Sequence, residues 1–150
     1  MKVRDVMRRE LTSIPATMKI GRVIELMERM RISELIITDR DFKVKGIVTD
    51  GIILKAALPR YFSYLDTTAY LPDLDEFAIG LKDLSKKEVG TIMLKDIYTI
   101  YEDTKVLDLI DVMIGRRLKI LPVVDNEGKL VGIVDRPSMF KKALIYGEKL

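Results

Sequence analysis

The chain contains two copies of one unit, and this internal repeat restricts the possible folds more than any other feature of the sequence. Shifting the sequence by 86 residues aligns positions 3–58 with positions 89–144 without a gap, and more than a quarter of the aligned pairs are identical. The clearest match pairs Gly46-Ile47-Val48 with Gly132-Ile133-Val134. A unit of this size buries only about 60% of its unfolded surface and is marginally stable alone. We therefore expect the copies to form one structural domain, packed sheet to sheet with pseudo-twofold symmetry and with the helices outside.

Each copy carries the same order of predicted elements: strand, helix, strand, strand, helix, which is an α/β (α+β) βαββα unit. Apolar residues at helical spacing predict the first helix, and a short apolar run after it predicts a buried strand. An Asp-led polar turn then connects two strands as a hairpin. The predicted segments are strands at 11–14 and 97–101, helices at 20–30 and 106–113, strands at 35–37 and 120–124, turns at 39–43 and 125–129, strands at 44–48 and 130–134, and helices at 51–58 and 137–146.

The segment between the copies, residues 59–88, differs from both copies in composition. It holds half of the aromatic residues of the chain, and its six acidic residues outnumber its four basic ones. This composition indicates a packed segment and not a flexible linker. We expect helices at 60–65 and 72–84. Two interpretations stay open: the segment caps exposed core, or it supports dimerisation or contacts a protein partner. The domain prediction is thus 1–58 for the first unit, 59–88 for the insert and 89–150 for the second unit.

The composition excludes several classes of function. The chain has no His and no Cys, which removes imidazole catalysis, thiol chemistry and the usual zinc and iron–sulfur ligands. No carboxylate pair has the spacing and apolar setting of a tuned acid and base, so we expect neither an enzyme nor a metal site. The net charge of +3 does not indicate a protein dominated by attraction to nucleic acid.

Two further features concern the environment of the protein. No apolar run approaches the ~18 residues of a membrane span, and the charged start leaves no room for a signal peptide, so we expect a cytoplasmic protein that contacts no membrane. A single Asn, no Gln and 33% charged residues are typical of a high-temperature source, although eight Met residues are not.

Three short motifs connect the repeat to a known family. They are Val-Arg-Asp-Val-Met at 3–7, Leu-Pro-Val-Val-Asp at 121–125 and Gly-Ile-Val-Thr-Asp at 46–50. With these motifs each unit resembles a cystathionine-β-synthase (CBS) domain, and the tandem resembles a CBS pair, or Bateman module. The resemblance implies a regulatory sensor that needs no cofactor, binds AMP, ADP, ATP or S-adenosylmethionine in clefts between the units, and pairs into a homodimer through the CBS units.

The resemblance also implies which residues contact the ligand. Apolar side chains would hold adenine, while the turn from the last strand to the last helix, together with nearby cations, would hold ribose and phosphates. The residues placed there are Ile14, Ile32, Thr49, Ile100, Arg117, Leu118, Lys119, Asp135 and Ser138. The same apolar residues also suit a plain core, and the cations also suit a solvated helix end.

The strand-to-helix turns match the family pattern only in part. That pattern has Thr or Ser after the Gly-containing strand and Asp or Asn three residues later. The first copy has Thr49 but then Ile52, whereas the second copy has Asp135 in the place of the hydroxyl and Ser138 in the place of the Asp. The departures leave an alternative open, a ligand-free scaffold that binds a protein through residues 59–88. A weaker alternative is nucleic-acid binding through a set of arginines, namely Arg8, Arg9, Arg29, Arg31, Arg116 and Arg117.

Overall fold

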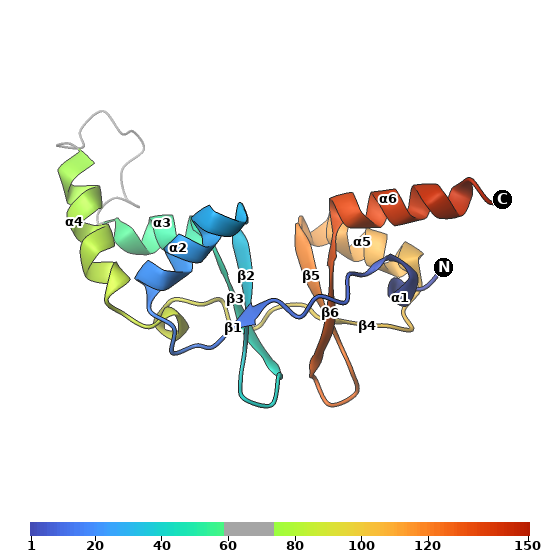
Figure 1. Ribbon diagram of the computed structural model, residues 1–150, viewed down its shortest axis with the longest axis horizontal. Coiled ribbons are helices and arrows are strands. Elements are labelled where there is room, and N and C mark those ends of the chain that lie inside the picture. Colours follow the sequence, from blue (N-terminus) through green and yellow to red (C-terminus); the bar gives the residue numbers. More distant parts are fainter. Residues whose placement is uncertain (59–73) are drawn as a thin grey trace. The chain divides into compact units, whose positions relative to one another are not determined.

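The structure is a computed structural model that describes residues 1–58 and 74–150 (Figure 1). It is a mixed α+β fold with two small sheets and surrounding helices, as the repeat predicted. Its elements in chain order are α1 (Val3–Val6), β1 (Ser13–Ile14), α2 (Ile20–Met30), β2 (Glu34–Thr38), β3 (Val44–Thr49), α3 (Asp50–Ala57), α4 (Leu74–Ser85), the 3-10 helix η3 (Val89–Thr91), β4 (Ile100–Tyr101), α5 (Val106–Arg116), β5 (Ile120–Val124), β6 (Leu130–Asp135) and α6 (Arg136–Gly147).

The strands form two three-stranded sheets, one from each repeat. Their strand orders are β1-β2-β3 and β4-β5-β6. In the second sheet β4 runs parallel to β5, with Ile100 opposite Val123, and β5 pairs antiparallel with β6. Within the described residues the predicted strands and helices of both repeats are present, with ends that differ by a few residues. The strands before the first helices are shorter than expected, at two residues each.

The two hairpin turns share one construction. Asp39 Oδ1 accepts hydrogen bonds from the backbone N–H groups of Asp41 and Lys43, at 2.9 and 3.0 Å. Asp125 Oδ1 accepts from the residues two and four positions later at 2.8 and 2.9 Å. The chain then passes through the left-handed region, at Gly128 in the second repeat (φ 81°) and at Phe42 in the first (φ 61°). An Asp side chain that bonds the following backbone N–H groups stabilises such a turn, as the sequence predicted.

The contacts of the chain divide it into two compact units, and these units differ from the sequence repeats. One unit contains residues 1–13, 38–45 and 96–150, and the other contains 14–37 and 46–95. The opening segment of each repeat therefore packs on the other repeat. Val3, Val6 and Met7 belong to the core with Leu109, whereas Val89 belongs to the core of the first repeat.

Backbone bridges hold both exchanged segments in place. The N–H of Arg8 donates to the Ile133 carbonyl at 2.8 Å, and the N–H of Ile133 donates back at 2.9 Å. Ile47 and Leu94 form the corresponding pair, with both bonds at 2.9 Å. The sequence analysis expected no element at the openings of the repeats, yet the structure has short helices there, α1 and η3.

A glycine next to each bridge permits the close approach. A Cβ on Gly132 would lie 2.7 Å from the Arg8 carbonyl oxygen, and a Cβ on Gly46 would lie 2.6 Å from that of Leu94. Real Cβ atoms do not come so near, so the identical Gly in the two Gly-Ile-Val motifs follows from packing.

The insert contributes one described helix. The predicted helix at 72–84 is confirmed as α4, from Leu74, whereas the one expected at 60–65 lies outside the described residues. Phe77 and Leu81 pack against the core of the first repeat, and Leu84 is part of that core. Among the helices that the structure describes, none is long and apolar enough to cross a membrane.

Candidate functional site

The last strand of the first repeat leads into α3 through Thr49. Its hydroxyl oxygen caps the helix by accepting the N–H of Ile52 at 3.1 Å. The next N–H, of Asp50, donates to the Ser33 carbonyl at 2.9 Å, which ties this turn to the loop before β2. The Thr49 oxygen has accepted one bond, but its O–H remains a donor. Thr49 is half-buried, so part of this residue lies open to solvent.

The equivalent turn of the second repeat carries a carboxylate. Asp135 caps α6, and its Oδ1 accepts the N–H of Ser138 at 2.8 Å. The Ser138 hydroxyl also donates to Asp135 Oδ2, at 3.2 Å. Arg8 Nε lies 2.7 Å from the same Oδ2 and forms an ion pair with it. The sequence analysis named Asp135 and Ser138 as candidate residues of this turn, but the sequence gave no indication that Arg8, from the opening of the first repeat, joins them.

Hydrogen bonds from Ser138 and the ion pair with Arg8 together favour the charged form of Asp135. Partial burial alone raises the pKa of this carboxyl, but the hydrogen bonds from Ser138 and the charge of Arg8 outweigh burial and lower the pKa below its ordinary value of 3.8. A carboxylate held in this state accepts hydrogen bonds from hydroxyl groups and repels phosphate. The two turns thus present different chemistry on equivalent backbones.

The loops that precede β2 and β5 hold further predicted site residues. The N–H groups of Ile32 and Leu118 donate to the carbonyls of Met27 and Met113, at 3.1 and 3.2 Å. Only their carbonyls are therefore available to accept a bond from an adenine amino group. Both side chains are half-buried and pack on the core of their own unit.

The cations of the second loop differ in their surroundings. Arg117 ends α5 in the left-handed region, at φ 53°, and its side chain is exposed, as is that of Lys119. Arg116 instead stacks on the Tyr98 ring, with its guanidinium carbon 4.6 Å from the ring centre. Of the three cations, Arg117 and Lys119 are the ones presented to solvent without such a stacking partner among the described residues.

Ile14 and Ile100 are deep core residues. Their exposed fractions are 4% and 5%, and each belongs to the apolar cluster of its own unit. This burial gives both residues a structural role, and an adenine contact through them stays a prediction. The candidate residues are divided between the two units: Ile14, Ile32 and Thr49 lie in one, and the other contains Ile100, Arg117, Leu118, Lys119, Asp135 and Ser138.

Two residues near the turns were missed or assigned another role in the sequence analysis. Arg8 was considered only for nucleic-acid binding, and its contact with Asp135 spans more than 120 positions, which no local pattern reveals. Ser33 acts through its backbone carbonyl, which any residue type supplies. Over the described part of the chain, no group of three or more acidic side chains has the arrangement of a metal site.

Comparison with protein-family models decides the family. The model for the CBS domain matches residues 3–59 and 89–143, which correspond to the two repeats. The chain belongs to the CBS domain family. Because both repeats match, it carries a tandem CBS pair, as its three sequence motifs predicted.

Individual relatives agree with this assignment. The chain is 26% identical to the uncharacterised protein MJ1426 of Methanocaldococcus jannaschii, over 94% of this chain and 90% of that protein. The crystal structure of CBSX2 from Arabidopsis thaliana in complex with AMP superposes with a TM-score of 0.74 at 23% identity, covering 97% of this chain and 98% of that one. The CBS domain pair of MJ0100, in complex with 5-methylthioadenosine and S-adenosyl-L-methionine, superposes with a TM-score of 0.67 at 21% identity, covering 100% and 98%. At these identities the two structures establish the fold of the CBS pair.

Proposed function

We propose that this CBS pair is a non-enzymatic regulatory module that binds an adenosine-containing nucleotide. The observation that carries the proposal is the chemistry of the two strand-to-helix turns, where Thr49 offers a hydroxyl donor and Asp135 a charged acceptor. CBS pairs of the same fold bind AMP in CBSX2, and 5-methylthioadenosine and S-adenosylmethionine in MJ0100. All of these ligands contain the adenosine core that the two turns would recognise.

The two turns suit different parts of such ligands. The Thr49 hydroxyl can donate to a phosphate or ribose oxygen, and the N-terminal end of α3 favours negative charge. The Asp135 carboxylate can accept ribose hydroxyls, and it disfavours a phosphate beside it. In the same unit as Asp135, the exposed Arg117 and Lys119 are the candidates for phosphate contact. We therefore propose that the Thr49 turn favours a phosphate of AMP, ADP or ATP, and that the Asp135 turn favours a ribose.

Binding would be transmitted through a homodimer. A ligand shifts a conformational equilibrium only by its differential affinity for the two states. A dimer of CBS pairs supplies such states, because ligand occupancy in each chain can alter how the chains pack. A regulated protein would then recognise one of the dimer states.

Titration calorimetry tests the nucleotide proposal. AMP, ADP, ATP and S-adenosylmethionine are titrated in turn into the full chain, and at least one is expected to bind with a dissociation constant below one millimolar. Thr49→Val removes the hydroxyl at nearly constant volume and is expected to weaken AMP binding about tenfold, the effect of losing one charge-assisted hydrogen bond. The matched variant, Thr17→Val, changes an exposed residue of the same type outside the sequence of both turns and should bind AMP as the parent chain does. Absence of both heat and a melting shift with all four ligands would refute the proposal.

A second candidate function is a ligand-free scaffold. It is favoured by the ion pair between Asp135 and Arg8, which already satisfies the carboxylate, and by Ile52, which replaces the expected carboxylate of the first turn. In this case a protein partner would bind through the insert at 59–88. Removing residues 59–73 would then abolish capture of that partner. Neither the parent chain nor the shortened chain would bind a nucleotide in the calorimeter.

A further inference from the structure

Arg8 stands beside the strand-to-helix turn of the second repeat, and the backbone around it is held there by several contacts. The N–H and carbonyl of Arg8 exchange hydrogen bonds with Ile133, at 2.8 and 2.9 Å. The ammonium group of Lys142, on α6, donates to the carbonyl of Met7, the residue before Arg8. The backbone therefore places the Arg8 side chain beside Asp135, and the ion pair is not the only interaction that keeps it there.

The guanidinium of Arg8 has donors left for a ligand. Its Nε lies 2.7 Å from Oδ2 of Asp135, and its Nη1 donates to the Glu10 carboxylate at 3.1 Å. Nη2 has no partner among the described residues. The Glu10 side chain is 71% exposed, and an ion pair so close to solvent contributes little to stability, so an anion of a ligand can replace it. Both Nη groups can thus bind a phosphate while Nε stays with Asp135.

Asp135 keeps room for one ribose hydroxyl beside this cation. Its Oδ1 accepts the N–H of Ser138, whereas its Oδ2 meets both the Ser138 hydroxyl and Arg8. Since each carboxylate oxygen has two lone pairs, Oδ1 can accept one more hydrogen bond. The charge of Arg8 also offsets the repulsion between this carboxylate and a phosphate. The turn therefore suits a ligand that has a ribose and a phosphate next to each other.

The first repeat has no cation at the equivalent place. The 86-residue offset makes Leu94 the equivalent of Arg8, and Leu94 exchanges the same pair of backbone bonds with Ile47. Each turn thus has one residue of an opening segment bridged to its last strand. That residue is leucine for the turn with Thr49 and arginine for the turn with Asp135. Of the two turns, the guanidinium accompanies the one whose carboxylate would otherwise repel a phosphate.

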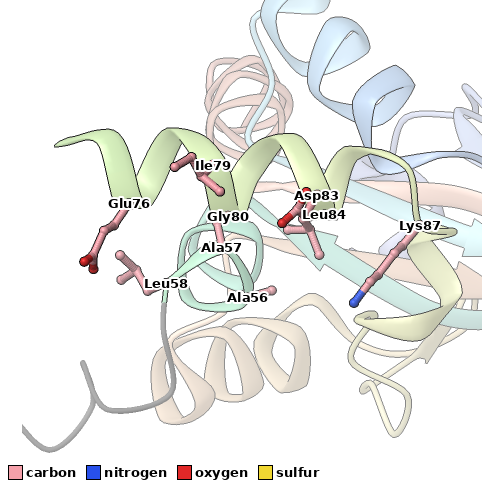
Figure 2. Close-up of a pocket in the computed structure, with 9 residues that line it drawn as sticks. All are labelled: Ala56, Ala57, Leu58, Glu76, Ile79, Gly80, Asp83, Leu84 and Lys87. Carbon is pink, nitrogen blue, oxygen red and sulfur yellow. The ribbon is translucent and has the colours of Figure 1, made fainter.

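The cavity of the first repeat does not offer a second place for a phosphate. α4 crosses α3 so closely that a Cβ on Gly80 would overlap the carbonyl oxygen of Ala57, and a cavity of about 440 Å³ lies beside the crossing (Figure 2). The charged residues of its wall are Glu76, Asp83 and Lys87. Two acidic groups against one basic group disfavour an anion there.

We propose that Arg8 binds the phosphate of a nucleotide at the turn of the second repeat, and that it makes this turn select phosphorylated over unphosphorylated adenosine ligands. The inference rests on the proposed function and names the residue that determines which ligand the turn prefers. AMP has both groups that the turn recognises, a ribose for Asp135 and a phosphate for Arg8. Adenosine has only the ribose.

Titration calorimetry of AMP and of adenosine with the full chain tests the proposal. The parent chain is expected to bind AMP more tightly than adenosine. Arg8→Met keeps an unbranched side chain and removes the cation, so the dissociation constant of AMP should rise at least about tenfold while that of adenosine stays nearly constant. Both are also measured in Thr49→Val, where the contribution of the first turn is reduced. The matched control is Arg9→Met, which removes the same charge from the neighbouring residue, whose side chain is 66% exposed, and should select AMP as the parent chain does.

A double variant, Arg8→Met with Asp135→Asn, separates contact from charge neutralisation. Asp135→Asn removes the charge that repels phosphate, yet the preference for AMP over adenosine should stay as low as in Arg8→Met, because the donors to the phosphate are still missing. The double variant leaves no unpaired charge at the turn, so it keeps its fold even if Arg8→Met does not, and melting without ligand checks both.

The outcomes distinguish this inference from the proposed function. The inference is wrong if the double variant regains the preference of the parent chain, if Arg8→Met weakens AMP and adenosine equally or leaves AMP unchanged, or if Arg9→Met has the same effect as Arg8→Met. In each of these cases nucleotide binding still stands. A parent chain that binds neither ligand, nor any other adenosine nucleotide, would refute both.

Discussion

The two repeats share the order of their strands and helices but differ in the side chains they present. Equivalent residues close the hairpin turns, end the first helices in the left-handed region at Arg31 and Arg117, and keep a glycine where a neighbouring strand approaches. The differences fall on the cap of the last helix, Thr49 against Asp135, and on α4, which packs against α3 of the first repeat. Gly46 and Gly132, where another segment approaches closely, are thus the same residue type in both repeats, whereas the capping side chains differ.

The largest expected effect comes from breaking what the repeats share. Gly132→Ala would force a Cβ against the Arg8 carbonyl and the Met7 sulfur, and Gly46→Ala would do the same against Leu94 and Met93. We expect each variant to lose about 1–3 kcal/mol of unfolding free energy, as overpacked cores do. Urea denaturation measures the loss. Gly115→Ala is the control, because no atom lies within 4 Å of its added Cβ and Ala favours the helix, so it should be neutral or stabilising.

A smaller loss of stability is expected from changing the helix-capping residues, Thr49 and Asp135, and its pH dependence should differ between them. Asp135→Asn keeps a capping oxygen but removes the charge paired with Arg8, so we expect a loss of about 1 kcal/mol near neutral pH, a modest value because the pair is partly solvated. The folded state holds the pKa of Asp135 below its ordinary value of 3.8. The stabilisation is therefore complete above that value and disappears as the pH falls through the lowered pKa.

Thermal unfolding from pH 7 to pH 2 checks this prediction. The melting curves of the parent chain and Asp135→Asn should converge in acid. Thr49→Ala removes a neutral cap worth about 1 kcal/mol. Its melting temperature should therefore lie below that of the parent chain by a similar interval at every pH. A gap between the parent chain and Asp135→Asn that stays constant down to pH 2 would contradict the ion-pair explanation.

The smallest expected effect concerns the hairpin turns. Phe42 adopts the left-handed conformation that its equivalent, Gly128, adopts without strain. Phe42 is also exposed, so Phe42→Gly gives up little packing and should gain about 0.5 kcal/mol after the entropy cost of glycine. The reverse change, Gly128→Ala, should lose a similar amount. Calorimetric melting of both variants measures the two changes in stability. A loss of stability in Phe42→Gly would show that the Phe42 ring packs against the protein in solution.

Local sequence patterns predicted most of the fold correctly. The Asp-closed turns depend on residues within five positions of one another, as Asp125 and its two N–H partners illustrate. The candidate site was predicted less completely. Asp135 and Ser138, which bond to each other in one turn, were named as candidates from the sequence, whereas the ion pair of Asp135 with Arg8 was not expected.

The sequence by itself determined the duplication, the family and the order of elements, because period, turn chemistry and capping are short-range properties of the chain. Only the tertiary structure decided that each repeat takes the opening segment of the other, that Arg8 pairs with Asp135, and that α4 packs against α3. These features depend on which segments, distant in the sequence, pack against each other. That choice is set by the total surface buried and by the steric fit at residues such as Gly80 and Gly132, and no local pattern encodes it.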